Sequence, residues 1–434
     1  TATGSGLWRW GRLEHFGWCG SLLAVIFGLL FLGIGLNSRH GTSETIASVQ
    51  LAQAIAGTDD VRTYGTIAVY RPEGAESLIQ TSQGGEFLPD MTGAAGSTSR
   101  MVTTDLGTFH WENVSQPPGV VGVYSIVTSG TNADRLEARA TVTAEGIVGT
   151  CAAQLSAGTD AVIATRRGRM SVQLAVDGNF TAGPDDVMEP DQYLDATLLN
   201  DVQDRRRRIL QQLFGNQQWQ NSLDQPQLLV WVSGWEHGFQ FGEGLERQGD
   251  TLLIAPLELS RPAAGTEFVI PSPLLDFVNL RPPDGSSPAS FWDDGRQEWQ
   301  QRSSPSTTWL SVQVPAAFLP LQAKHVRLEI NVSGLMGQIE ILGTKDGNVV
   351  SLQTVADPVG TVIIDIDDPE SLTVSENGEL PLGVSAGVLE ESDPAQANSA
   401  TGTGFDADTP ANYWRIDSLS VQLRAITTEF AEED

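Results

Sequence analysis

The sequence has little cysteine and little positive charge. It holds two cysteines in 434 residues, which excludes a disulfide-rich scaffold and a zinc cluster held by cysteine thiolates. There are 25 Lys and Arg residues against 54 Asp and Glu residues, which gives a formal net charge of -29. A surface that binds nucleic acid needs a basic face, so we expect no nucleic-acid partner.

Several signatures of catalysis are also missing. The chain has no HExxH motif, no CxxC pair and no phosphate-binding GxxxxGK[ST] loop. Its five histidines are scattered along the sequence. We therefore predict that the protein is not an enzyme, with no catalytic residues and no cofactor.

One long apolar run is present, and it lies near the N-terminus. Residues 16–36 contain no charged side chain. At about 1.5 Å per residue, a helix of this length spans roughly 30 Å, the thickness of the hydrocarbon core of a bilayer. We predict a single transmembrane helix over residues 16–36, after an N-terminal tail of residues 1–15. A cleaved signal peptide is the alternative, but its apolar region is usually shorter and ends in small residues.

Residues around this run predict its orientation and its contacts. Arg9 and Arg12 precede it and Arg39 follows it, a weak positive-inside bias that favours a cytoplasmic N-terminus. The body would then be periplasmic, with the anchor in a bacterial inner membrane. Small residues let membrane helices approach closely, and aromatic rings favour the headgroup layer. We therefore expect contacts to lipid and to other membrane subunits through Trp8, Trp10, Trp18, Gly28 and Gly33.

The rest of the chain has a mainly β pattern with two β-rich domains. Ser43 as a cap, with Ile46, Val49 and Ile55, predicts a juxtamembrane helix over 43–56. Further along, the pattern predicts a β-rich domain over 58–185, a connecting helix over 190–214, and a β domain over 225–434 that ends in an acidic tail. The alternating strands of this last domain favour an antiparallel sandwich of the jelly-roll type.

The connecting helix carries an unusual run of four arginines. Arg205, Arg206, Arg207 and Arg208 are consecutive, so a helix spreads them over its whole circumference. One interpretation is a solvated face, partly paired with Asp201 and Asp204. The other is a contact to acidic lipid headgroups or to an acidic partner.

Two acidic clusters have spacings that suit calcium. Asp365 and Asp367 would share one face of a predicted strand, with Asp368 next to them, and Asp406 and Asp408 lie in a glycine-rich segment. Carboxylate oxygens are the ligands that Ca²⁺ prefers. Solvated turn carboxylates are the alternative interpretation of both clusters.

Residues 291–299 combine aromatic rings with carboxylates. Trp292 and Trp299 suit a protein interface, a packed loop, or a site where a sugar stacks on an aromatic ring. From these observations we predict a single-pass, non-catalytic accessory or scaffold subunit of a larger membrane complex. The alternative is a membrane-anchored, glycan-binding protein of the cell envelope that uses the C-terminal sandwich.

Overall fold

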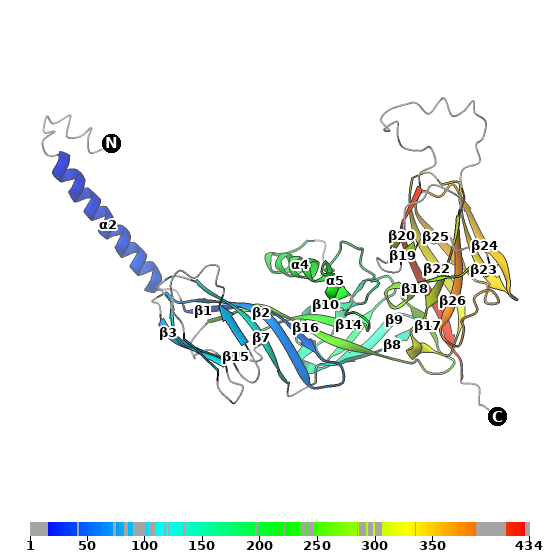
Figure 1. Ribbon diagram of the computed structural model, residues 1–434, viewed down its shortest axis with the longest axis horizontal. Coiled ribbons are helices and arrows are strands. Elements are labelled where there is room, and N and C mark those ends of the chain that lie inside the picture. The colour runs from blue at the N-terminus through cyan, green and yellow to red at the C-terminus, as the bar shows by residue number, and fades with distance from the viewer. Residues whose placement is uncertain are drawn as a thin grey trace. The chain divides into compact units, whose positions relative to one another are not determined.

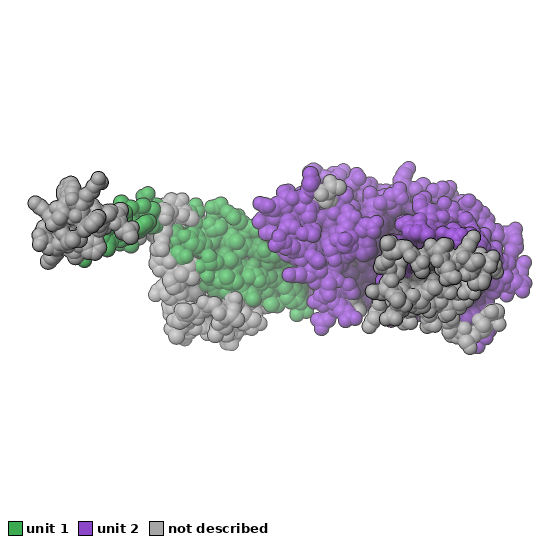
Figure 2. Space-filling model, turned by 90° about the horizontal axis from the view of Figure 1, so that it is seen from above, with its two compact units in different colours: residues 1–53, 60–133, 232–252 green, residues 54–59, 134–231, 253–434 purple. Residues whose placement is uncertain are grey.

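In the computed structural model, strands dominate the chain and form several sheets, as predicted (Figure 1). The chain divides into two compact units, coloured separately in Figure 2. Unit 1 holds residues 1–53, 60–133 and 232–252, and unit 2 holds residues 54–59, 134–231 and 253–434. The described residues are 16–40, 43–72, 75–81, 86–89, 100–103, 109–116, 119, 121–132, 135–195, 198–220, 222–235, 239–240, 246–283, 285, 292–293, 298–299, 306–334, 336–387 and 414–429.

The apolar run near the N-terminus forms helix α2, Phe16–His40. Among the helices of the described residues, none combines the length and the apolar character that crossing a membrane requires. The predicted transmembrane helix is therefore not confirmed.

Unit 1 is built on neighbouring strands of one sheet, in the order β1 (Thr45–Ala54), β2 (Asp60–Tyr70), β7 (Val121–Thr131) and β4 (Glu86–Pro89). The pairing of β2 with β7 runs without a break from Asp60 opposite Thr131 to Tyr70 opposite Val121. Alternate residues such as Ile67 and Ile126 are buried, which places the core on one face of this sheet. A second sheet has the order β15 (Phe239–Gln240), β3 (Ala75–Thr81), β6 (Phe109–Gln116) and β5 (Arg100–Thr103).

The helix predicted over 43–56 is wrong, because these residues form strand β1. The buried positions are Ile46, Gln50, Ala52 and Ala54, which fit the two-residue period of a strand. Val49 is 46% exposed, although it belonged to the apolar stripe of the predicted helix. The small and polar character of the true core positions concealed the strand period in the sequence.

The first part of unit 2 combines short strands with three helices. Strand β16 (Glu246–Ser260), of which residues 253–260 belong to this unit, runs parallel to β8 (Ala138–Thr143), with Leu257 opposite Ala138. β8 pairs with β9 (Gly146–Cys151), which pairs with β13 (Asn179–Ala182) and then β12 (Gln173–Leu174). β10 (Thr159–Ala164) pairs with β11 (Arg169–Ser171) and β14 (Gln227–Ser233). The helices are α3 (Ala153–Ser156), α4 (Asp201–Phe214) and α5 (Gln217–Gln220).

Helix α4 begins later than predicted. Asn200 is its N-cap, and its side chain accepts a hydrogen bond from the Gln203 backbone N–H. The Gln203 side chain accepts one from the Asn200 backbone N–H in return, which completes a capping box. Residues 190–195 and 198–199 are therefore outside the helix.

The second part of unit 2 is a sandwich of two antiparallel sheets. One sheet has the order β17 (Glu267–Ile270), β27 (Trp414–Thr427), β22 (Leu321–Gly334) and β25 (Gly360–Ile366). The other has the order β18 (Asp276–Leu280), β21 (Ser306–Gln313), β26 (Glu379–Gly387), β23 (Gln338–Lys345) and β24 (Asn348–Ala356). Two short 3-10 helices connect strands of the sandwich. They are η2 (Ser272–Leu274), between β17 and β18, and η3 (Ala316–Phe318), between β21 and β22. A short strand pair, β19 (Trp292–Asp293) and β20 (Glu298–Trp299), follows β18 in the chain.

Candidate functional site: a polar pocket on a sheet of the sandwich

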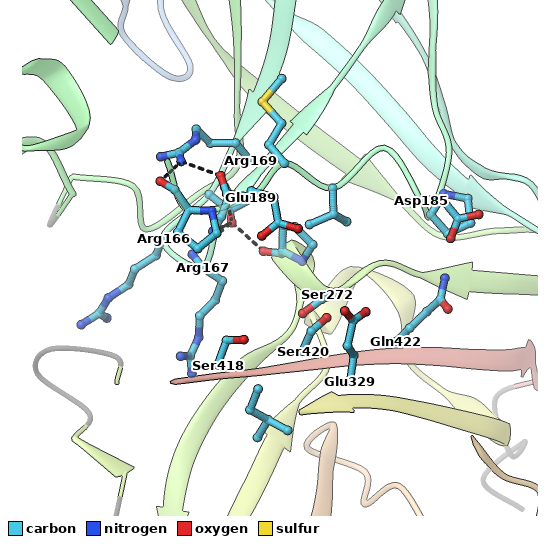
Figure 3. A pocket seen from close by; sticks show the side chains of 18 of the residues that line it. Arg166, Arg167, Arg169, Asp185, Glu189, Ser272, Glu329, Ser418, Ser420 and Gln422 are labelled. Carbon is cyan, nitrogen blue, oxygen red and sulfur yellow. Dashed lines mark hydrogen bonds between the residues drawn. The ribbon is translucent and has the colours of Figure 1, made fainter. Parts of the chain in front are cut away.

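A pocket of about 530 Å³ lies within unit 2. Strands β22 and β27 of the sandwich line one side of it. The turn between β10 and β11, the segment 184–190 and helix η2 line the other side (Figure 3). Small-molecule sites usually have volumes of roughly 300–1,000 Å³, so the pocket has a suitable size for a ligand.

The floor of the pocket is polar because the two strands alternate. On β22, Val326, Leu328 and Ile330 are buried in the sandwich, so Arg327 and Glu329 face outward. On β27, Ser418, Ser420 and Gln422 occupy the corresponding outward positions. Arg327 is directly opposite Gln422, and Glu329 is directly opposite Ser420. Facing Cβ atoms of such pairs are about 5 Å apart, so these side chains form a compact grid of donors and acceptors.

The opposite wall is fixed by Arg167 and Thr165 in the turn after β10. The Thr165 hydroxyl donates a hydrogen bond of 2.6 Å to the carbonyl of Pro273 in η2. The Arg167 side chain is 7% exposed, and its Nε lies 2.5 Å from Asp276 Oδ1. Its Nη2 donates to the Phe277 carbonyl at 2.8 Å, and its guanidinium stacks 4.4 Å from the Phe277 ring centre. The turn is therefore attached to the strand β18 of the sandwich before any ligand arrives.

Arg169 holds the adjacent segment of the wall. Its Nη2 donates to the Pro190 and Glu189 carbonyls at 2.6 and 3.3 Å, and its Nε donates to the Gln192 carbonyl at 3.2 Å. The guanidinium also stacks against the rings of Tyr193 and Phe214. Burial lowers the pKa of Arg169, an effect partly offset by Tyr193 and Asp191. Arg169 thus serves the structure of the wall and has little capacity left for a ligand.

Other polar groups of the lining are available. Arg166, Arg327 and Glu329 are exposed. Within the described part of the chain, the side chains of Arg327, Glu329, Ser420 and Gln422 have no hydrogen-bond or ion-pair partner. The Ser272 hydroxyl accepts a hydrogen bond of 3.2 Å from the Val421 backbone N–H, which leaves its own proton free to donate. The pocket can therefore form several hydrogen bonds with a bound molecule.

The sequence contained only part of this site. The outward positions of β22 and β27 follow from the alternation that predicted these strands. Arg166 and Arg167 lie in the turn between the paired strands β10 and β11, inside the predicted β-rich domain over 58–185. Nothing in the sequence showed that this turn would lie against residues of the sandwich more than a hundred positions later.

The arginine run on α4 is mostly occupied by ion pairs. Arg206 binds Asp160, with 2.6 Å between Nη1 and Oδ2. Arg207 and Arg208 both bind Asp204, Arg207 with 2.8 Å between Nη2 and Oδ1. Arg205 is exposed and has no such partner among the described residues. Of the four arginines, Arg205 is therefore the most available for the predicted contact to lipid or to an acidic partner.

Trp292 and Trp299 are buried rather than presented to a ligand. They are 5% and 7% exposed, and their rings meet edge to face with 5.9 Å between centres. Phe277 packs on Trp292, and Arg167 lies over the same ring. This burial fits the packed-loop interpretation, and a contact of these two tryptophans with a partner or a sugar stays a prediction. Their rings pack in the region next to the pocket wall.

The first acidic cluster does not converge on one point. Asp365 Oδ1 lies 3.2 Å from His325 Nε2, and Asp367 Oδ1 lies 3.8 Å from His325 Nδ1. Asp368 accepts a hydrogen bond of 2.7 Å from the Ser371 hydroxyl and another from the Glu370 N–H, which lower its pKa. Among the described residues, no three His, Cys, Asp or Glu side chains are placed to hold a metal ion together.

Some predicted site residues lie outside the described residues, namely Trp8, Trp10, Asp406 and Asp408. Trp18, Gly28 and Gly33 lie in helix α2. Apart from the adjoining residues and backbone of α2 itself, no atom of the described residues comes within 4 Å of a Cβ built on Gly28 or Gly33, so packing within the described chain does not require either glycine.

The segment from Gly383 to Gly387 has the GxSxG pattern of the nucleophile elbow of hydrolases. An elbow needs a sharp turn from a strand into a helix. Here the segment lies within strand β26, and the Thr307 hydroxyl donates a hydrogen bond of 3.0 Å to the Ser385 hydroxyl. Ser385 is therefore not placed as a nucleophile.

No protein-family model and no curated protein sequence matches the chain. Among solved structures, an M1 zinc metallopeptidase from Deinococcus radiodurans aligns with 12% identity over 32% of this chain and 37% of its own length, at a TM-score of 0.15. A protein from Corynebacterium diphtheriae described as membrane anchored aligns with 12% identity over 90% of this chain and 89% of its own, at a TM-score of 0.12. The chain thus spans less than two fifths of the metallopeptidase, and TM-scores this low establish no shared fold.

Proposed function

We propose that this protein is a single-pass, membrane-anchored, non-catalytic accessory or scaffold subunit of a larger membrane complex. The observation that carries the proposal is the surface of helix α2. Nine large apolar side chains between Leu22 and Ile34 are each at least 48% exposed. Burying one such side chain is worth about 1.5–3 kcal/mol, so a helix that exposes nine of them favours lipid or a partner over water.

The composition of α2 supports lipid as its surroundings. Residues 16–36 carry no charge, and Arg39 and His40 follow at its C-terminal end. A helix that is apolar on all sides is typical of a membrane span. Arg9 and Arg12 on the other side favour a cytoplasmic N-terminus, with the acidic body in the periplasm and α2 in a bacterial inner membrane.

One face of α2 suits a second membrane helix. Gly20, Ala24 and Gly28 recur every four residues, so they lie along one side of the helix. This small-xxx-small pattern lets two helix backbones approach closely in lipid. Gly33 is rotated by about 140° from Gly28, so it lies on another side. The contact we propose therefore uses Gly28 and does not use Gly33.

The pocket and the sandwich agree with a non-catalytic role. The described lining of the pocket contains neither histidine nor cysteine, two residue types that often act as general base or nucleophile. We also assign the sandwich to the jelly-roll type, because strands that follow one another in the chain mostly lie in opposite sheets. Jelly rolls carry many unrelated functions, so the fold itself selects none of them.

Extraction of membranes at alkaline pH tests the anchor. The full chain, expressed in bacteria, should stay in the membrane pellet after carbonate treatment, because lipid contacts of a spanning helix do not depend on charge. A chain that is released with the peripheral proteins would contradict the proposal.

A pair of matched variants tests the subunit contact. Ala24→Leu combined with Gly28→Leu should reduce co-purification of membrane partners from mild detergent, since bulky side chains separate the two helices. Gly33→Leu, on another side of α2, should leave co-purification unchanged. If both variants retain the partners equally, α2 is a tether and does not form the contact.

A further inference from the structure

We propose that the pocket between β22, β27 and the β10–β11 turn is a binding site for a saccharide. This inference goes beyond the anchoring role, because it assigns a ligand to the body of the protein. It also differs from a site on the tryptophan-rich segment, whose rings are buried.

The polar side chains of the lining include hydrogen-bond donors and hydrogen-bond acceptors. They suit a ligand whose polar atoms mostly donate and accept hydrogen bonds at the same time. Arg327 is a donor only, and Glu329, two residues along the same strand, is an acceptor only. Ser420 and Gln422, opposite them, can act in both ways. Each sugar hydroxyl donates one hydrogen bond and accepts others, so a saccharide can satisfy all four side chains together.

The pocket also offers apolar surface. Val187 is 36% exposed, and Leu419, Pro184 and Pro190 belong to the same lining. A saccharide ring has C–H faces that need such surface, whereas a small inorganic anion does not. The mixture of apolar and polar groups is therefore better suited to a saccharide than to a phosphate or a sulfate.

The charge of the site gives no preference for an anion. Arg166, Arg167, Arg169 and Arg327 contribute four positive charges to the lining. Asp185, Glu189 and Glu329 contribute three negative charges, and Asp276, which pairs with Arg167, contributes a fourth. The four charges of each sign cancel, so the electrostatic attraction for a simple anion is weak.

The position of the floor disfavours an extended peptide. Peptides often bind by adding a strand to the edge of a sheet, where backbone groups are unpaired. At the floor, β22 pairs on both sides, with β25 and with β27. β17 pairs with β27 only over Leu423–Ile426, but next to this stretch the Val421 N–H of β27 already donates to the Ser272 hydroxyl. The Arg327 and Glu329 part of the floor therefore recognises a ligand through side chains, as in the binding of a saccharide.

The walls are arranged before binding, which lowers the entropic cost of association. Thr165 and Arg167 attach the turn to Pro273, Asp276 and Phe277, and Ser272 accepts a hydrogen bond from Val421 of the floor strand β27. Because both sides of the pocket are fixed in this way, we expect binding without a large change of structure.

The experiment uses the full chain in a detergent without a sugar headgroup, because a glycosidic detergent would itself occupy the site. The chain is applied to an array of neutral and uronate-containing oligosaccharides, and the best binder is then titrated in solution. We expect at least one oligosaccharide to bind with a Kd below about 1 mM. Glu329→Gln and Arg327→Ala should each weaken this binding about tenfold or more, since a hydrogen bond to a charged group is lost.

Matched control variants test whether a loss of binding is specific to substitutions in the pocket. Glu340→Gln on β23 and Arg424→Ala on β27 change the same residue types outside the pocket lining, and both should bind as the unmodified chain does. An unchanged melting temperature of the Glu329→Gln and Arg327→Ala chains shows that they are folded.

Three results would overturn the proposal. The first is no binding to any oligosaccharide of the array. The second is binding that the Glu329→Gln and Arg327→Ala chains retain in full. The third is displacement of the oligosaccharide by inorganic phosphate at equal concentration, which would make the site an anion site. None of these results bears on the membrane anchor, which is tested separately.

Discussion

The Arg206 guanidinium on α4 lies 2.6 Å from the Asp160 carboxylate on β10, and both side chains are largely buried at 11% and 18% exposure. Arg206 Nη1 also donates to the Thr159 hydroxyl at 2.9 Å, and its guanidinium lies over the ring of Trp231. Helix α4 is thus held to the strands β10 and β14 by one arginine of the four in its run.

Removing this arginine should destabilise unit 2. Arg206→Ala leaves the Asp160 carboxylate partly buried without its cation, which typically costs about 2–4 kcal/mol. We expect the free energy of unfolding, measured with urea, to fall by that amount. Arg208→Ala is the control, because its pair with Asp204 is exposed and such pairs contribute little. Equal effects of the two substitutions would contradict this assignment.

The arginine run shows how far the sequence could predict this protein. Helical spacing predicted the pairing of Arg208 with Asp204, and the structure confirms it. The partner of Arg206 is 46 residues away in the chain, and local spacing has no information about such a contact. The same limit applies to the pocket, whose floor and wall come from distant segments.

The sequence pattern predicts the buried residues well in strand β22 and poorly in strand β1. In β22, every second residue from Val326 to Val332 is both apolar and buried, so sequence and structure agree. In β1, the buried position Gln50 is polar, while Val49 and, directly after the strand, Ile55 are apolar and exposed. The hydrophobic pattern of β1 thus does not show which of its faces is buried. The strand is formed through its pairing in the sheet, where β2 is its neighbour.

Gly65 on β2 lies close to the backbone of β1, and this contact can be tested by substitution. A Cβ at this position would lie 2.5 Å from the Val49 carbonyl oxygen and 2.8 Å from Gln50 Cγ. Backbone of a paired strand cannot move aside easily, so Gly65→Ala should lower the free energy of unfolding by about 1–3 kcal/mol. Thr66→Ala, the exposed neighbour, should have a smaller effect. A thermal unfolding series that ranks the two variants in reverse order would disprove the close packing.

Gln50 itself predicts a stabilising substitution. Its side chain is 0% exposed, and neither its amide nitrogen nor its amide oxygen has a hydrogen-bond partner among the described residues. Such a group loses its hydration on folding without compensation. Gln50→Met keeps a similar shape and removes the polar atoms, so the free energy of unfolding should rise by about 1 kcal/mol. Gln53→Met, at a half-buried position of the same strand, should show no such gain in chemical denaturation.

A drop in stability after Gln50→Met would carry a different meaning. It would show that the amide has a partner in the protein in solution, such as an ordered water molecule. Thr63, whose buried hydroxyl also has no partner within the described part of the chain, would then be the next residue to substitute.

The burial of the Cys151 thiol should make the free energy of unfolding depend on pH. Burial raises its pKa from 9.0 to about 11. Between these values the unfolded chain has lost the proton while the folded chain still holds it. Since stability falls with pH wherever the folded state binds more protons, Cys151 should reduce the free energy of unfolding as the pH rises from about 9 to 11. The measurement is the difference between the unmodified chain and Cys151→Ala across this range, which cancels the other titrating groups.

The same shift should protect Cys151 from alkylation. The thiolate is the reactive form, and an ordinary exposed cysteine has a pKa of about 8.5. Near pH 8, a thiol with a pKa of about 11 has roughly a hundredfold less thiolate than such a cysteine. In a Cys19→Ser chain, where Cys151 is the remaining cysteine, iodoacetamide should therefore react about a hundred times more slowly in the folded protein than in urea. Comparable rates in the two conditions would show that the thiol is exposed and that burial does not control its pKa.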